Sequence, residues 1–126
     1  MDNLTIYLDI DGVLCSYLDI GKEYRSTIDH EHIFRDYSVN ALNEIINYYQ
    51  ADLCMISGWN SGFKTPEDYK TFLISRGVVV NNLRIAYQHN RLKYIIQDIN
   101  DNKIDKYLII DDEGYCVKDE KNKDAW

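Results

Sequence analysis

Residues 4–14 read LTIYLDIDGVL, an apolar run that ends in two acidic residues and a glycine. The run is short and rich in β-branched and aromatic side chains, which predicts a buried strand over about residues 4–9. Because side chains alternate between the faces of a strand, we expect Asp9 and Asp11 on the same side at its carboxyl end. Two carboxylates this close raise each other's pKa unless a cation or a proton lies between them. The alternative is a solvated Asp-Gly turn that only ends the strand.

The length and composition of the chain indicate one compact domain, residues 1–126. The chain is 45% apolar and its net charge is −7, and this acidic balance argues against strong non-specific binding to nucleic acid. No apolar stretch is long enough to span a bilayer, and the first residues lack the pattern of a signal peptide, so no membrane partner is expected. The three cysteines have no paired spacing, which indicates free thiols in a reducing compartment and favours a cytoplasmic protein.

Strand patterns alternate with helix patterns along the chain. Further strands are expected over residues 51–56, 78–80 and 107–110. Helices are expected after cap residues at Ser38, Thr65 and Asn90. This order predicts an α/β fold, a Rossmann-like three-layer sandwich with a mostly parallel sheet and helices on both faces.

Polar residues follow three of the expected strands, at positions 9 and 11, 57 and 58, and 111 and 112. The carboxyl ends of parallel strands meet at one edge of a sheet, and ligands bind outside that edge. Arg91 and Lys93 open the helix whose start faces the same edge. Taken singly, each group is an ordinary turn or a solvated helix face. Together, several carboxylates beside cations and a hydroxyl suit Mg²⁺ with a substrate phosphate, and predict phosphoryl transfer through an aspartyl-phosphate.

These segments resemble, in chain order, the four motifs of the haloacid dehalogenase (HAD) superfamily of phosphohydrolases. Residues 9–14 are similar to the first motif and residues 56–59 to the second. Arg91 or Lys93 is similar to the third, and residues 110–112 to the fourth.

The resemblance implies a role for each acidic residue. Asp9 would be the nucleophile and a Mg²⁺ ligand. Asp11 would be the general acid and base, and its backbone carbonyl would also bind the metal. Asp111 would bind Mg²⁺ directly, whereas Asp112 would act through water or by orienting a ligand.

The resemblance also implies how the phosphate is bound. Ser57 and the Gly58 N–H would hold the transferring phosphoryl group, and Arg91 or Lys93 would balance its charge. Most of the family has a lysine at the third motif, and the sequence leaves open which of the two residues takes its place. The choice matters because arginine clamps phosphate through two hydrogen bonds, whereas lysine acts as a point charge.

The chain resembles the small HAD-like domains of RNA-repair proteins, and the segments between its motifs imply a minimal cap or none. We therefore expect a Mg²⁺-dependent phosphatase, a phosphomonoester hydrolase acting on a nucleotide or a polynucleotide end. Trp59 either stacks on a base of that substrate or fills the core. One alternative is a phosphatase of sugar or nucleotide phosphates, which the acidic charge favours, and another is a non-catalytic HAD-like binding or regulatory protein. The sequence indicates no oligomeric state.

Overall fold

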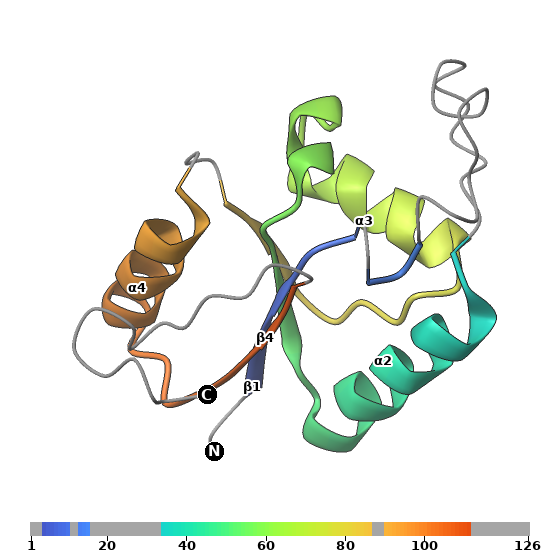
Figure 1. Ribbon diagram of the computed structural model, residues 1–126, viewed down its shortest axis with the longest axis horizontal. Helices are drawn as coiled ribbons and strands as arrows, with labels where there is room; N and C mark the ends of the chain where they lie inside the picture. The colour runs from blue at the N-terminus through green and yellow to red at the C-terminus, as the bar shows by residue number, and fades with distance from the viewer. Residues whose placement is uncertain (1–3, 11–12, 16–33, 87–89, 112–126) are drawn as a thin grey trace.

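The computed structural model describes residues 4–10, 13–15, 34–86 and 90–111. Within these ranges the elements follow one another as strand, helix, strand, 3₁₀ turn, helix, strand, helix and strand (Figure 1). In chain order they are β1 (Leu4–Leu8), α2 (Asp36–Tyr49), β2 (Asp52–Met55), η1 (Gly58–Gly62), α3 (Pro66–Ser75), β3 (Leu83–Ile85), α4 (Arg91–Asp101) and β4 (Lys106–Ile110). None of the described helices has the length and apolar character needed to cross a membrane.

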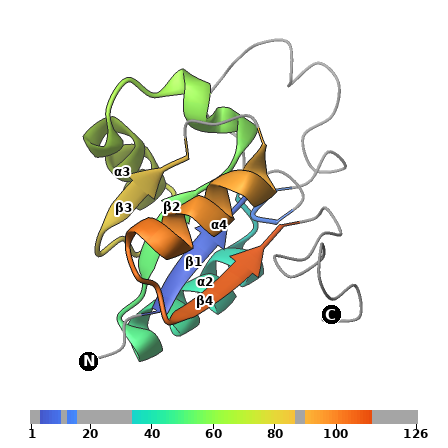
Figure 2. The ribbon, with the colours of Figure 1, turned by 90° about the vertical axis from the view of Figure 1, so that its left-hand side faces the viewer.

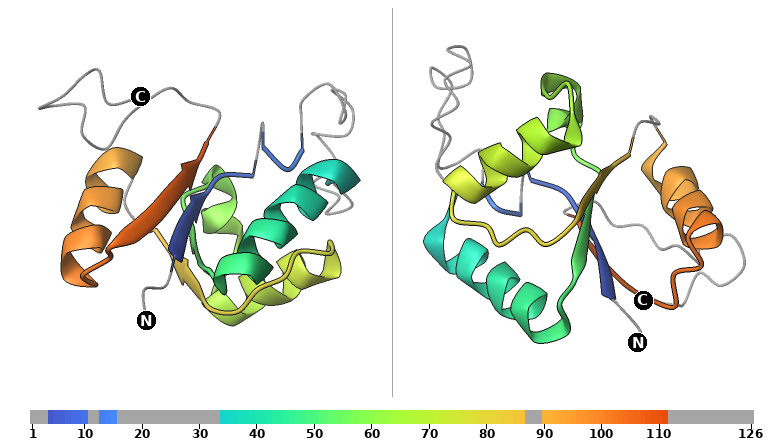
Figure 3. Two further views of the ribbon diagram at one scale, coloured as in Figure 1. Left: turned by 90° about the horizontal axis from the view of Figure 1, so that it is seen from below. Right: turned by 180° about the vertical axis from the view of Figure 1, so that it is seen from behind.

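The described strands form one parallel sheet in the order β3-β2-β1-β4. Helices α2 and α3 cover one face of this sheet, and α4 covers the other (Figures 1 and 3). Figure 2 looks onto the second face and shows α4 in front of the sheet. The predicted α/β three-layer fold is therefore confirmed, and β1 lies at its centre.

The core explains why β1 is buried along its whole length. Ile6 and Leu8 pack toward α2 and α3, whereas Tyr7 and Cys54 pack toward α4. A strand covered by helices on both faces has no solvated side, so all five residues of β1 are buried. Cys54 and Cys15 are buried free thiols, as predicted, while Cys116 lies outside the described residues.

The strand predicted at residues 78–80 is wrong, because the third strand is β3, which begins at Leu83. The valine run instead joins the end of α3 to α2. The Val78 N–H donates to the Leu73 carbonyl at 3.0 Å, and the Val79 N–H donates to the Asn43 side-chain oxygen at 2.9 Å. A short apolar run predicts burial, and here that burial comes without strand pairing.

Two of the three predicted helix caps are confirmed. Thr65 Oγ1 accepts a hydrogen bond from the Asp68 N–H at 3.1 Å, and Asn90 Oδ1 accepts one from the Lys93 N–H at 3.0 Å. Ser38 is not a cap, because α2 already begins at Asp36. The Val39 N–H donates to the Arg35 carbonyl at 3.0 Å, so the helical ladder includes Ser38 in its first turn.

Candidate active site

Two buried carboxylates lie side by side at the carboxyl edge of the sheet. Leu8 of β1 pairs with Ile110 of β4, so Asp9 and Asp111, which follow them, are neighbours. The Asp9 N–H donates to the Ile110 carbonyl at 2.9 Å and continues this register by one residue. Asp9 is 3% exposed, and the Asp111 side chain is 1% exposed. Burial of two acidic side chains this close is costly unless positive charge is supplied.

Arg91, the first residue of α4, supplies that charge. Its Nη1 lies 3.3 Å from Asp9 Oδ2, and 3.2 and 3.0 Å from the two carboxylate oxygens of Asp111. One guanidinium therefore bridges both carboxylates. The Arg91 side chain is 26% exposed, so the cluster opens to solvent on the arginine side.

The pKa of Asp9 is raised to about 7, and burial is the main cause. The charge of Asp111 and a hydrogen bond with its side chain raise the pKa further, whereas Arg91 and the Ile10 N–H lower it. The Ile10 N–H donates to Asp9 Oδ1 at 2.8 Å and so holds the carboxylate in one orientation. A divalent cation at this position would favour the ionised form of both acids, and their hard oxygen atoms are ligands that Mg²⁺ prefers.

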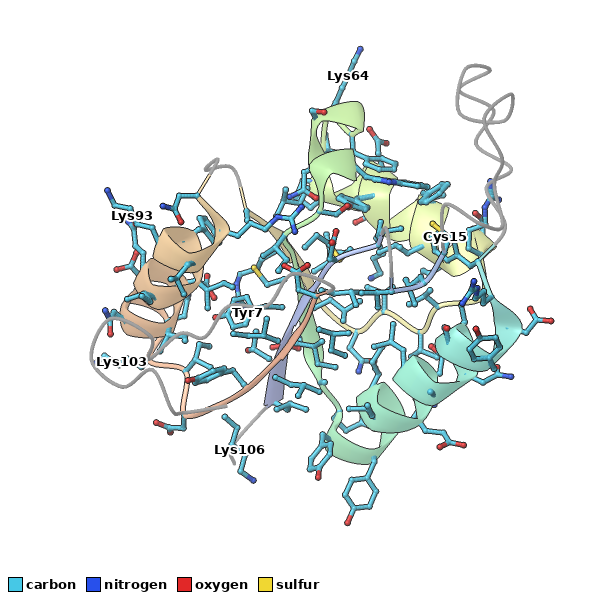
Figure 4. The ribbon with its side chains drawn as sticks, in the orientation of Figure 1. Tyr7, Cys15, Lys64, Lys93, Lys103 and Lys106 are labelled. Carbon is cyan, nitrogen blue, oxygen red and sulfur yellow. The ribbon has the colours of Figure 1, made fainter. Side chains whose placement is uncertain are left out.

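Lys93 does not join this cluster. Its side chain is exposed and extends away from the sheet on the outer side of α4 (Figure 4). Of the two cations considered for the third motif, the structure brings only Arg91 to Asp9 and Asp111.

Ser57 and Gly58 follow β2 at the same edge of the sheet. The Ile56 N–H donates to the Leu8 carbonyl at 3.0 Å, which keeps β2 paired with β1 up to the residues before Ser57 and Asp9. Ser57 is buried, and its Oγ accepts a hydrogen bond from the Trp59 N–H at 3.1 Å that starts η1. A Cβ placed on Gly58 would meet no atom within 4 Å, so the space next to this residue is open to a ligand.

Asn60 holds the turn η1 against the sheet, a role that the sequence pattern does not predict. Its Nδ2 donates to the Met55 carbonyl at 2.8 Å and to the Ala86 carbonyl at 2.9 Å. Its Oδ1 accepts from the Tyr69 hydroxyl of α3 at 2.9 Å. The local sequence signal, an asparagine between glycines, predicts only a turn. Asn60 therefore fixes the Ser57-Gly58 turn to the ends of β2 and β3.

Trp59 has the packing of a residue that fills the core. Its ring is half-buried and lies 6.1 Å from the ring of Phe34 and 5.7 Å from that of Phe72, centre to centre. These contacts favour the core interpretation over a free stacking platform.

Two of the predicted site residues, Asp11 and Asp112, lie outside the described residues. Within the described ranges, no group of three or more His, Cys, Asp or Glu side chains is placed to hold a metal ion. Of the four acids predicted to bind metal, Asp9 and Asp111 are the two that the structure describes, and both contact Arg91.

Comparison with protein families gives one match that extends over nearly the whole chain. The model of the HAD domain in Swiss Army Knife RNA repair proteins matches residues 5–125. No match was found among curated proteins or among solved structures. The matched range includes the residues of all four motif-like segments.

Proposed function

The chain belongs to the family of HAD domains found in Swiss Army Knife RNA repair proteins, and on this premise we propose that it is a Mg²⁺-dependent phosphatase. The observation that carries the proposal is the meeting of Asp9, Asp111 and Arg91 at the carboxyl edge of the sheet. Carboxylates suit a metal ion and a guanidinium suits a phosphate, so this cluster supports a site for both.

In this proposal Asp9 and Asp111 would bind Mg²⁺ directly. The backbone carbonyl of Asp11 would also bind it, and Asp112 would act through water or by orienting a ligand. When bound, the ion would supply positive charge to the phosphoryl oxygens. The donor chemistry fits, because the two described acids present carboxylate oxygen atoms, which are ligands that Mg²⁺ prefers.

The chemical steps are assigned to residues of the chain. The Asp9 carboxylate attacks phosphorus, and the bond from phosphorus to the leaving oxygen breaks as the aspartyl-phosphate forms. Asp11 gives a proton to the leaving oxygen and then takes one from the water that hydrolyses the aspartyl-phosphate. Ser57 Oγ and the Gly58 N–H donate hydrogen bonds to the phosphoryl oxygens, and Arg91 balances their charge.

The proposed substrate is a phosphomonoester at the end of a nucleic acid or on a nucleotide. The family name supports this choice, since it refers to RNA repair proteins. The net charge of −7 limits the contacts that the protein makes with a long polyanion. We therefore expect recognition of the terminal phosphate rather than of an extended strand.

The test is hydrolysis of p-nitrophenyl phosphate, of sugar phosphates and of 5′- and 3′-phosphorylated oligoribonucleotides, with Mg²⁺ and with EDTA. Asp9→Asn keeps the shape of the side chain and removes the attacking charge, so turnover should be abolished while the fold is kept. The control is Asp101→Asn, the same chemical change at an exposed residue at the far end of α4. Full activity of Asp9→Asn would contradict the mechanism. Activity on the aryl ester and on sugar phosphates alone would favour a small-molecule phosphatase.

A further inference from the structure

A second polar contact joins β1 to α4. It lies nearer the start of β1 and the end of α4 than the contact between Asp9 and Arg91 does. Tyr7 lies two residues before Asp9, which continues the pairing of β1 with β4 by one residue, so both side chains lie on the same side of the sheet. Asp98 lies seven residues after Arg91, which is about two helical turns, so both project from the same face of α4. The Tyr7 hydroxyl donates to Asp98 Oδ2 at 2.5 Å. Figure 4 shows Tyr7 between β1 and α4.

The Asp98 carboxylate is held from several elements at once. Arg84 of β3 donates to it through Nε at 3.2 Å and through Nη2 at 2.7 Å. Asn102 Nδ2, just after α4, donates to Asp98 Oδ1 at 2.9 Å. Within the described part of the chain, both oxygens of this buried carboxylate therefore accept two hydrogen bonds each. These bonds come from β1, from β3 and from the end of α4 itself.

Attachment of α4 to the sheet does not by itself require this network. Ile95 is fully buried, and Ile99 and Tyr94 pack in the same apolar layer. Apolar contacts are non-directional and allow a helix to slide or rotate, whereas hydrogen bonds to a carboxylate have defined directions. A buried ion pair adds little net stability compared with apolar packing. We therefore expect the hydrogen bonds to Asp98 to affect the position of α4 more than the stability of the fold.

We propose that Tyr7, Arg84 and Asp98 form a positioning cluster for Arg91. The cluster fixes where the first turn of α4 stands over the ends of β1 and β4, and thereby brings the guanidinium onto Asp9 and Asp111. The inference rests on the proposed function, because it gives these three residues a part in that site without contact to the substrate. They are positioning residues, which act on the reaction through Arg91.

The variants that test the proposal are Tyr7→Phe and Asp98→Asn. Tyr7→Phe removes one hydroxyl and leaves the contact between Arg84 and Asp98 intact. The matched control is Tyr107→Phe, because the ring of Tyr107 packs edge-to-face on that of Tyr7 at 6.4 Å between centres. Among the described residues the Tyr107 hydroxyl has no hydrogen-bond partner, so the control makes the same chemical change outside the cluster.

The main readout is the Nε–Hε resonance of Arg91 in ¹⁵N NMR spectra, assigned by its loss in Arg91→Lys. This resonance reports the surroundings of the guanidinium without any need for turnover. We expect it to shift in Tyr7→Phe and in Asp98→Asn and to stay in place in Tyr107→Phe. The kcat/KM for p-nitrophenyl phosphate, normalised to folded protein, should fall roughly tenfold or more in the two cluster variants.

An unchanged Arg91 resonance in folded Tyr7→Phe and Asp98→Asn would overturn the proposal, whatever happens to activity. If Asp98→Asn does not fold, Tyr7→Phe decides the question alone. Absence of turnover in the unsubstituted protein would count against the proposed function, while the Arg91 resonance would still decide whether the cluster positions this residue. The two failures are therefore distinguishable.

Discussion

Arg91 and Lys93 differ in function, on our proposal, because of where the helix begins. Residues two positions apart on an α-helix point about 200° apart, so both cannot face one site. The Asn90 cap fixes Arg91 as the first residue of α4 and points it toward the strand ends. Lys93 then falls on the exposed face of the helix. A cap residue outside the site thus determines which cation meets the acids.

We predict that Arg91→Ala lowers kcat/KM by roughly 10²- to 10³-fold, because it removes the donor that faces the developing charge. Arg91→Lys should recover part of this loss, since a point charge replaces the planar fork without its geometry. Lys93→Ala is the matched control and should change kcat/KM by less than about twofold. Steady-state kinetics on an aryl phosphate measures all three variants. Equal losses for Arg91→Ala and Lys93→Ala would contradict the assignment.

At the scale of elements, the site depends on how η1 is held against the sheet. The turn that begins at Gly58 is short, and the hydrogen bonds within it cannot fix it relative to two strands. Asn60 provides that connection, since one side chain reaches the ends of β2 and β3 and the hydroxyl of Tyr69. The Asn60 amide therefore links the turn η1 to helix α3 by a hydrogen bond, beside the ring contact between Trp59 and Phe72.

We predict that Asn60→Ala destabilises the fold by roughly 2–4 kcal/mol, because it removes the three hydrogen bonds that the Asn60 side chain makes with the Met55 carbonyl, the Ala86 carbonyl and the Tyr69 hydroxyl. Asn47→Ala is the control, since Asn47 is an exposed residue of α2, and its effect should stay within about 0.5 kcal/mol. Urea denaturation followed by circular dichroism gives both free energies of unfolding. An Asn60→Ala protein as stable as Asn47→Ala would show that the amide does not hold the turn.

At the scale of the whole molecule, the parts of the fold that the sequence predicts correctly depend on local patterns. The buried run of β1 and the caps at Thr65 and Asn90 follow from residues that are close in the chain. Asn60 and the Asp98 cluster do not, because their partners lie on several elements and come together only when the sheet forms. The choice of Arg91 over Lys93 also needed the rotation of α4, which apolar periodicity predicts only approximately.

The overall charge leads to a prediction about substrate binding. With a net charge of −7, the protein should contact only one or two phosphates of an oligonucleotide near the cleaved end. For single strands, the logarithm of the binding constant falls linearly with the logarithm of salt concentration, and the slope is proportional to the number of phosphates contacted. With one or two contacts, kcat/KM should fall only about three- to sevenfold between 50 and 200 mM salt. The same salt series with p-nitrophenyl phosphate, which has no neighbouring phosphates, is the control. A loss of about 10³-fold or more on the oligonucleotide alone would indicate about seven or more phosphate contacts. Recognition of an extended strand would then replace recognition of the terminal phosphate.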